Sequence, residues 1–185
     1  MQIPTIRAAR DSDAPELARL HVACWKETYV GLVPRSEIAA RDFEVRFLQW
    51  QDQLAAGLSR IVICPGFGFA QMGPRRDLSL QKSGWPEELY CLYLRISAQR
   101  RGLVLALMQA VTGYAPFTAL VLARNNTACR LYEAAGGAQI DRRSDWLGTV
   151  RVDEVVFGFR PPGDGMDDIT IRELTKSGEP GRSGS

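Results

Sequence analysis

The chain has 185 residues, of which 45% are hydrophobic and 24% are charged, as in one soluble globular domain with a substantial core. Its formal net charge of +2 is too small to indicate a nucleic-acid-binding surface. The four cysteines are dispersed and His21 is the single histidine, which argues against a zinc site or a disulfide framework.

The sequence offers no feature of an exported or membrane-spanning chain. The first residues are polar and lack an apolar signal core. No apolar run approaches the ~18 residues of a membrane span. We therefore expect a cytoplasmic protein with free cysteines, no metal, and no membrane or nucleic-acid partner.

The N-terminal third predicts one strand and a helix. Residues 3–8 are expected to form the strand. Asp13, with Glu16 three residues later, fits a capping box at the start of a helix. Leu17, Leu20 and later apolar residues repeat at helical spacing, and the helix is expected to end near Gly31.

A second helical stretch and a short hairpin are predicted next. Ser36 is expected to cap the helix and Gly57 to end it. Residues 61–64 and 67–72 are predicted strands around a Pro-Gly turn. Residues 73–87 are polar and rich in glycine and proline, so we expect a loop.

The most informative stretch follows this loop. An apolar run at 89–94 predicts a strand, residues 97–102 form a basic loop, and 103–111 predict an apolar helix. The first N–H groups of a helix lack intrahelical partners and lie at the positive end of its dipole. Arg100 and Arg101 add positive charge, so the sequence predicts a site for phosphate or pyrophosphate.

The remaining elements complete the predicted fold. Residues 119–123 indicate a strand, 127–135 a helix, and 138–146 with 150–159 a hairpin. The expected architecture is an α+β domain with a single mixed, mostly antiparallel central β-sheet flanked by helices.

The predicted domain spans residues 1–160. Residues 161–185 are rich in proline and glycine and are expected to form a flexible extension. Within it, residues 168–174 alternate well enough for a short strand.

Two motifs carry a resemblance to a known family. QRRGLV, residues 99–104, resembles the Q/R-x-x-G-x-G/A signature of the GNAT-type N-acetyltransferase superfamily. Residues 120–140 resemble the later strand of that family and the N-x-x-A-x-x-F/L-Y-E-x-x-G pattern that follows it. Residues 21–34 are similar to the first-helix segment of many members. Val104 departs from the signature, where the family has glycine or alanine.

The resemblance implies direct transfer of an acetyl group from acetyl-CoA to a primary amine in a ternary complex, with a small-molecule acceptor favoured. In the family, the signature loop holds the pyrophosphate and the preceding strand pairs with the pantetheine arm. The implied cofactor-binding residues are Leu92, Leu94, Gln99, Arg100, Arg101, Gly102, Leu103, Val104, Leu105 and Asn125. Asn125 has an equally weighted alternative as a helix N-cap.

Two residues are candidates for proton transfer. Tyr132 matches the family tyrosine that can protonate the departing thiolate, and its alternative is a core tyrosine. Glu88 stands where family members often place a carboxylate that acts as a base, directly or through water. Its equally weighted alternative is a solvated loop carboxylate.

Acceptor recognition is predicted for Trp25, Tyr29 and Trp85, although aromatic residues at such positions are more often core. A rival function is a non-catalytic acyl-CoA-binding or interaction protein on the same fold, which Val104 and the short hairpin favour. By resemblance, the C-terminal strands could also support a homodimer.

Overall fold

The computed structural model describes residues 5–99, 101–113 and 115–160. The predicted extension 161–185, its strand at 168–174 and Arg100 lie outside these residues. The described residues form one seven-stranded sheet with the order β1-β2-β3-β4-β5-β7-β6. The predicted α+β class with one mixed sheet is confirmed.

The strands and helices have the following bounds. The strands are β1 Arg7–Ala8, β2 Arg60–Cys64, β3 Gly68–Pro74, β4 Glu87–Leu94, β5 Phe117–Leu122, β6 Ala138–Leu147 and β7 Val150–Phe159. The α-helices are α1 Ala14–Tyr29, α2 Arg35–Ala39, α3 Phe43–Ala56, α4 Leu78–Lys82, α5 Leu103–Val111 and α6 Asn126–Ala134. Two short 3₁₀ turns, η1 Asp11–Asp13 and η2 Ile96–Ala98, precede α1 and α5.

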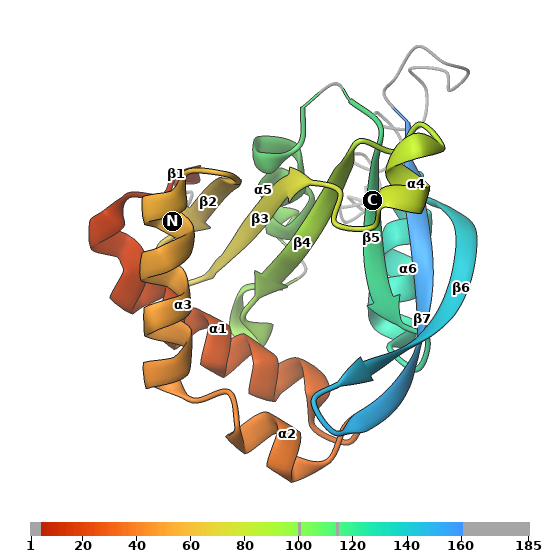
Figure 1. The fold of residues 1–185 in the computed structure, drawn as a ribbon. Coiled ribbons are helices and arrows are strands. Elements are labelled where there is room, and N and C mark those ends of the chain that lie inside the picture. The colour runs from red at the N-terminus through yellow and green to blue at the C-terminus, as the bar shows by residue number, and fades with distance from the viewer. Residues whose placement is uncertain (1–4, 100, 114, 161–185) are drawn as a thin grey trace, which may run out of the picture.

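The sheet is antiparallel except where β4 meets β5. A parallel pair needs a crossover connection, and here that connection contains α5. Strand β7 then returns antiparallel between β5 and β6. The single parallel pair therefore lies at the centre of the sheet, with hairpins on both sides (Figure 1).

Helices cover both faces of the sheet (Figure 1). Helices α5 and α6 pack on one face over an apolar cluster that includes Leu107, Val111 and Phe157. Helices α1 and α3 pack on the other face over a second cluster, which includes Leu17, Trp50 and Phe69. The two clusters hold the sheet between two helical layers. A ligand must therefore pass between helices to contact the centre of the sheet from either face.

The start of α1 differs from the predicted capping box. The Asp13 carboxylate accepts a hydrogen bond from the backbone N–H of Arg10 at 2.8 Å and pairs with Arg7 at 2.7 Å. Glu16 does not complete a box with Asp13, because its carboxylate accepts from the N–H of Gly66 at 2.7 Å. The predicted pairing was wrong because this contact spans fifty residues, beyond the reach of a local pattern.

The predicted second helix is in fact two helices. Helix α2 ends at Ala39, and Asp42 begins α3 by accepting from the N–H of Val45 at 3.0 Å. Ser36 lies inside α2 and is not a cap, so that prediction was wrong. Gly57 ends α3 with a φ of 60°, as predicted.

The segment 73–87 contains the short helix α4, which the sequence analysis assigned to a loop. Its short sequence gives too little apolar periodicity to be recognised. The predicted strand at 3–8 is described only at Arg7–Ala8. Among the described residues, no helix is long and apolar enough to cross a membrane.

Candidate active site

The parallel pair at the centre of the sheet is short. Strands β4 and β5 share three residue pairs, which end at Leu89 opposite Ala119. Beyond this point β4 continues to Leu94 and β5 to Leu122 without further pairing between them in the described ladder. The two strands diverge there (Figure 1). Backbone groups of β4 on the β5 side can consequently bind an extended ligand, which is the place predicted for pantetheine at Leu92 and Leu94.

A β-bulge in β4 sets which side chains face which helices. Gln71 of β3 pairs with Cys91, and the next residue, Met72, pairs with Leu89, so Tyr90 is the extra residue. Cys91 consequently packs against the apolar cluster below α1 and α3. Leu92 packs on the opposite cluster, beside α5. The bulge thus determines which residues of β4 face each of the two helical layers.

The N-terminus of α5 has the features of an anion site. Gly102 precedes the helix with a φ of 71°, and a Cβ built there would meet nothing within 4 Å. Among the described residues, no side chain caps the first N–H groups of α5. Arg101 and Gln99 are exposed beside the loop. Free N–H groups, open space and the helix dipole together fit a pyrophosphate.

Val104, the departure from the signature, lies in the first turn of α5. Its partly buried side chain packs against the apolar cluster on that face of the sheet, as Leu103 does more completely. A side chain that packs in the core leaves the backbone of the turn facing outward. The branched Cβ therefore does not by itself argue against a phosphate at this helix start.

Tyr132 of α6 is buried, with 8% of the residue exposed. Its ring packs edge-on against Phe157 and Phe159 of β7, with centroids 5.7 and 5.8 Å away. Burial raises the pKa of its hydroxyl, and Tyr29 and Cys91 raise it further. The side chain is therefore a protonated phenol at neutral pH.

Asn125 caps α6. Its side-chain oxygen accepts from the N–H of Ala128 at 3.1 Å. This is the alternative role considered for it from the sequence. Contact between Asn125 and a cofactor remains a prediction.

A cavity of about 530 Å³ lies on the α1–α3 side of the sheet. We call it the α1–α3 cavity. It is lined by His21 and Trp25 of α1, Arg46 of α3, Arg76 after β3, Cys91 and Tyr93 of β4, and further residues that include Arg41 and Leu147. Its floor is the part of β4 that follows the bulge, so the cavity and the α5 anion site approach the same strand from opposite faces.

The α1–α3 cavity is positively charged. Arg41, Arg46 and Arg76 line it, whereas no Asp or Glu is among its described lining residues. The guanidinium carbons of Arg41 and Arg46 lie 5.0 and 5.3 Å from the ring of Trp25. Burial together with Arg46 and Arg41 holds the pKa of His21 well below its usual range, so this ring is neutral.

Trp25 and Tyr29 were predicted to contact the acceptor, and the structure places both at this cavity or beside it. Trp25 lines it, and its ring centroid lies 4.1 Å from that of Tyr29. The hydroxyl of Tyr29 lies 3.4 Å from that of Tyr93, which forms part of the floor. Their contact with an acceptor remains a prediction.

Trp85 is not brought to the cavity. It is buried, and a Cβ on Gly158 of β7 would clash with its ring atoms. The guanidinium carbon of Arg160 lies 4.9 Å from its ring centroid. This position fits the core alternative considered from the sequence.

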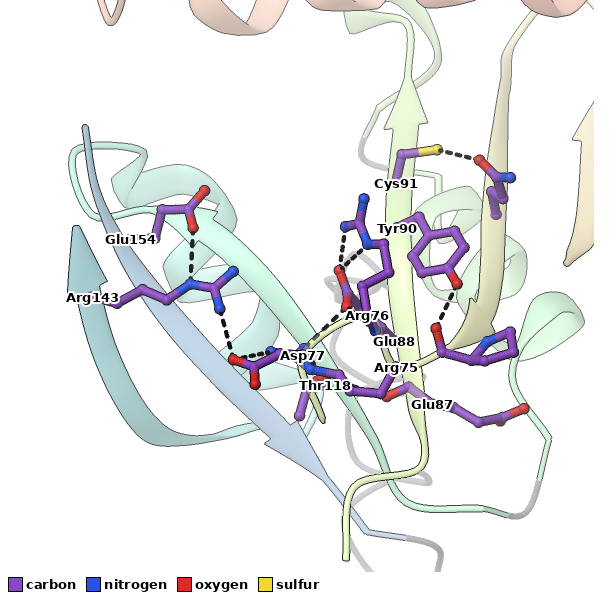
Figure 2. Close-up of polar contacts among 12 residues, drawn as sticks. Arg75, Arg76, Asp77, Glu87, Glu88, Tyr90, Cys91, Thr118, Arg143 and Glu154 are labelled. Carbon is purple, nitrogen blue, oxygen red and sulfur yellow. Dashed lines mark hydrogen bonds and ion pairs between the residues drawn. The ribbon is translucent and has the colours of Figure 1, made fainter. Parts of the chain in front are cut away.

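Glu88 lies in an ion-pair network rather than on a solvated loop. It is 2% exposed, so the solvated alternative was wrong. One carboxylate oxygen accepts from the Nε of Arg76 at 3.1 Å and closely from its Nη2. The other accepts from the backbone N–H of Arg76 at 3.3 Å and lies 3.4 Å from the fully buried Arg75 (Figure 2). Both oxygens are occupied, so direct removal of a substrate proton would require one of these contacts to break.

The network continues across the sheet. Arg75 also donates to the hydroxyl of Thr118 on β5. Arg143 of β6 donates to Asp77 at 3.2 Å and to Glu154 at 3.3 Å (Figure 2). These contacts connect β4, β5 and the β6–β7 hairpin on the side where β4 and β5 still pair. They hold fixed the end of the sheet from which the two strands diverge.

The rim of the α1–α3 cavity joins two distant parts of the chain. The Glu37 carboxylate of α2 accepts from the N–H of Thr149 at 3.0 Å and from its hydroxyl at 2.8 Å. Arg41 pairs with the same carboxylate at 3.0 Å. The hydrogen bonds from Thr149 and Arg41 lower the pKa of Glu37 to about 2. The tip of the β6–β7 hairpin is thereby tied to α2 beside the cavity residue Leu147.

Arg41 and Arg46 were not identified from the sequence as cavity residues. One signal was present for Arg46, because it lies three residues after Phe43 and four before Trp50, within the apolar stripe of α3. A charged residue in such a stripe is rarely buried unless it has a partner of opposite charge. The position of Arg76 at the cavity depends on the pairing of β3 with β4.

The comparisons with known proteins agree with this geometry. No known protein-family profile matches the chain. Over 163 residues the chain is 26% identical to the uncharacterized N-acetyltransferase YuaI of Bacillus subtilis (strain 168), which covers 84% of this chain and 92% of that protein.

Two solved structures show the same fold. The chain is similar to the PaiA N-acetyltransferase of Thermoplasma acidophilum in complex with coenzyme A, with a TM-score of 0.62 and 14% identity over 84% of this chain and 98% of that one. It is also similar to a GCN5-related N-acetyltransferase of Rhodopseudomonas palustris, with a TM-score of 0.65 and 16% identity over 87% and 97% of the two chains.

Proposed function

Since the chain belongs to the GNAT superfamily of N-acetyltransferases, we propose that it transfers an acetyl group from acetyl-CoA directly to a primary amine held in the α1–α3 cavity. Acetyl-CoA supplies the acetyl group as a thioester, whose carbonyl carbon an amine can attack. The observation that carries the proposal is the divergence of β4 and β5 between an uncapped helix N-terminus on one face and the α1–α3 cavity on the other.

The α5 side is proposed to hold the donor. The N–H groups of the first turn of α5 would bind the pyrophosphate, with Gly102 leaving room for its close approach. The backbone of β4 after the bulge would bind the pantetheine arm. The coenzyme A complex of the PaiA relative supports this choice of donor.

Tyr132 is proposed as the general acid. Its raised pKa keeps the phenol protonated, so its proton can go to the departing thiolate. As the C–N bond forms and the C–S bond breaks, the proton of the amine goes to water or to a base. Glu88 is the candidate for that base, through water, because its oxygens are engaged by Arg75 and Arg76.

The test is binding followed by turnover. Calorimetry with acetyl-CoA measures donor binding, and thiol release with a panel of amines, checked by mass spectrometry of the products, measures transfer. Failure to bind acetyl-CoA would contradict the proposal. Binding without transfer to any amine would favour the rival acyl-CoA-binding function.

Two charge-reversal variants test where the donor binds. Arg101→Glu should weaken acetyl-CoA binding about tenfold, because it places a carboxylate beside the pyrophosphate. Arg130→Glu reverses an exposed charge on α6 and should leave the Kd unchanged. Equal effects of the two variants would place the donor elsewhere.

A further inference from the structure

The positive charge of the α1–α3 cavity is only partly balanced by its surroundings. Arg41 pairs with Glu37 at 3.0 Å, and Arg76 pairs with Glu88. Within the described part of the chain, Arg46 has no carboxylate at ion-pair distance. It nevertheless has only 8% of its surface exposed and donates a hydrogen bond to the neutral amide of Gln49 at 2.7 Å.

A buried guanidinium without an anion is unfavourable for the ligand-free protein. Burial and the nearby Arg41 both lower the pKa of Arg46, which shows that its charge is opposed by its environment. The contact with the ring of Trp25 offsets only part of this cost. A ligand that supplies a negative charge beside Arg46 would offset the cost of burying its guanidinium.

Unsatisfied polar atoms gather on the same wall. The Nε of Arg46, the Nε1 of Trp25 and the Nδ1 of His21 are buried without a hydrogen-bond partner among the described residues. All three residues line the α1–α3 cavity. Two of these atoms are obligate donors, so this wall is suited to an acceptor oxygen.

We propose, building on the proposed function, that the amine substrate carries a carboxylate and that Arg46 binds this carboxylate. Among the described lining residues of the cavity, Arg46 is the one cation that has no carboxylate partner, which matches a group of single negative charge. Guanidinium and carboxylate are both planar and can share two parallel hydrogen bonds. A volume of about 530 Å³ accommodates a molecule of amino-acid size.

A doubly charged group is a poorer match. A phosphate would leave one charge unbalanced, because the remaining arginines already have Glu37 and Glu88 as partners. The carboxylate of a free amino acid also lies close to its own amine. A substrate anchored at Arg46 on α3 would then direct its amine toward β4, on the floor of the cavity.

A matched series of amines tests the substrate class. Phenylalanine, its carboxamide and phenethylamine share a side chain and differ in the group beside the amine, and equivalent series can be made from other side chains. We expect kcat/KM to be about 10²-fold higher for the carboxylate member of the productive series. Equal kcat/KM values for acid and amide, or a higher value for an aminophosphonate, would overturn the proposal.

Variants locate the carboxylate. Arg46→Gln should lower kcat/KM about 10²-fold for the carboxylate substrate and less than threefold for its amide, while Arg46→Lys should restore part of the difference. Arg19→Gln is the control, since Arg19 also lies over an aromatic ring, Phe43, but is exposed. An equal loss for acid and amide in Arg46→Gln would show a structural role only and contradict the proposal.

A stability measurement separates the two roles without any turnover. If Arg46 is kept for a ligand, Arg46→Gln should leave the Tm of the ligand-free protein unchanged or raise it. The carboxylate ligand should raise the Tm of the wild type and not that of the variant. A lower ligand-free Tm with no ligand-dependent difference would overturn the inference.

These outcomes differ from failure of the proposed function. A chain that binds no acetyl-CoA fails the proposed function, whatever Arg46 does. A chain that acetylates neutral amines as well as amino acids keeps the function and loses this inference.

Discussion

The proposed anion site on the α5 side is made of backbone groups from one short segment, whereas the α1–α3 cavity is made of side chains from α1, α3, β3, β4 and the β6 end. The first needs only a helix start, a glycine and open space. The second needs several helices and strands to be packed correctly before its residues meet. A fixed chemical group, such as a pyrophosphate, can be bound by backbone, but a variable acceptor must be selected by side chains. The two sides should therefore respond differently to substitution.

The largest effect on turnover is expected from Tyr132, which packs in the apolar cluster on the α5–α6 side. Tyr132→Phe should lower kcat roughly 10³-fold, because the thiolate leaves without a proton donor. The Kd for acetyl-CoA should stay within threefold of the wild type, since the ring still packs on Phe157 and Phe159.

Steady-state kinetics and calorimetry check this expectation. Unchanged kcat at every pH would remove Tyr132 from the reaction. A large loss of cofactor affinity would instead assign it to the donor site.

A substitution of Glu88 tests how much the ion pairs with Arg75 and Arg76 stabilise the fold. Glu88→Gln should lower the free energy of unfolding by about 3 kcal/mol, because it leaves the fully buried Arg75 without its closest carboxylate. Chemical denaturation measures this loss.

The pH dependence of kcat/KM in the same variant tests its role in proton transfer. If Glu88 only positions Arg75 and Arg76, the profile should keep its shape while its height falls. Disappearance of the low-pH limb, which reports the ionisation of the general base, would establish Glu88 as that base.

Val104 tests whether the donor side depends on backbone alone. Val104→Ala should lower the free energy of unfolding by about 1 kcal/mol through lost packing. The Kd for acetyl-CoA, measured by calorimetry, should change less than threefold. A tenfold tighter complex would show that the branched side chain crowds the pyrophosphate after all.

The smallest expected effect concerns the rim at Glu37. The carboxyl pKa is lowered from 4.5 to about 2, so its contribution to stability is fully present above pH 4.5 and is lost as the pH falls toward 2. Glu37→Gln should be less stable than the wild type at neutral pH, and the difference should shrink across that window. Thermal unfolding as a function of pH measures it, and a constant difference at every pH would contradict the assignment.

The sequence was most informative where structure is local. Helix α5 was predicted with its observed bounds, and the β6–β7 hairpin within one residue, because an apolar run between turn residues is enough to define each. The helix start that is proposed as an anion site could be located for the same reason, because it belongs to this local segment. Its family motif then pointed to the donor.

The acceptor side could not be predicted in the same way. Glu88 was recognised as a candidate, but its partners Arg76 and Arg75 lie twelve and thirteen residues earlier, after another strand. The cavity itself depends on Arg46 and Trp25 meeting across the α1–α3 interface. The break between α2 and α3 was missed for a smaller reason, since the Asp42 cap competes with a continuous apolar pattern.

The bulge at Tyr90 makes the spacing of β4 as important as its composition. After this residue, Cys91 and Tyr93 belong to one helical layer and Leu92 and Leu94 to the other. Because Leu89 already lies on the side of Leu92 and Leu94, removing Tyr90 would leave a regular strand with the same alternation, whereas a residue inserted after Cys91 would exchange the sides of Leu92, Tyr93 and Leu94. Loss of the bulge residue is therefore compatible with the alternation of β4, whereas insertions after Cys91 should be rare among related chains.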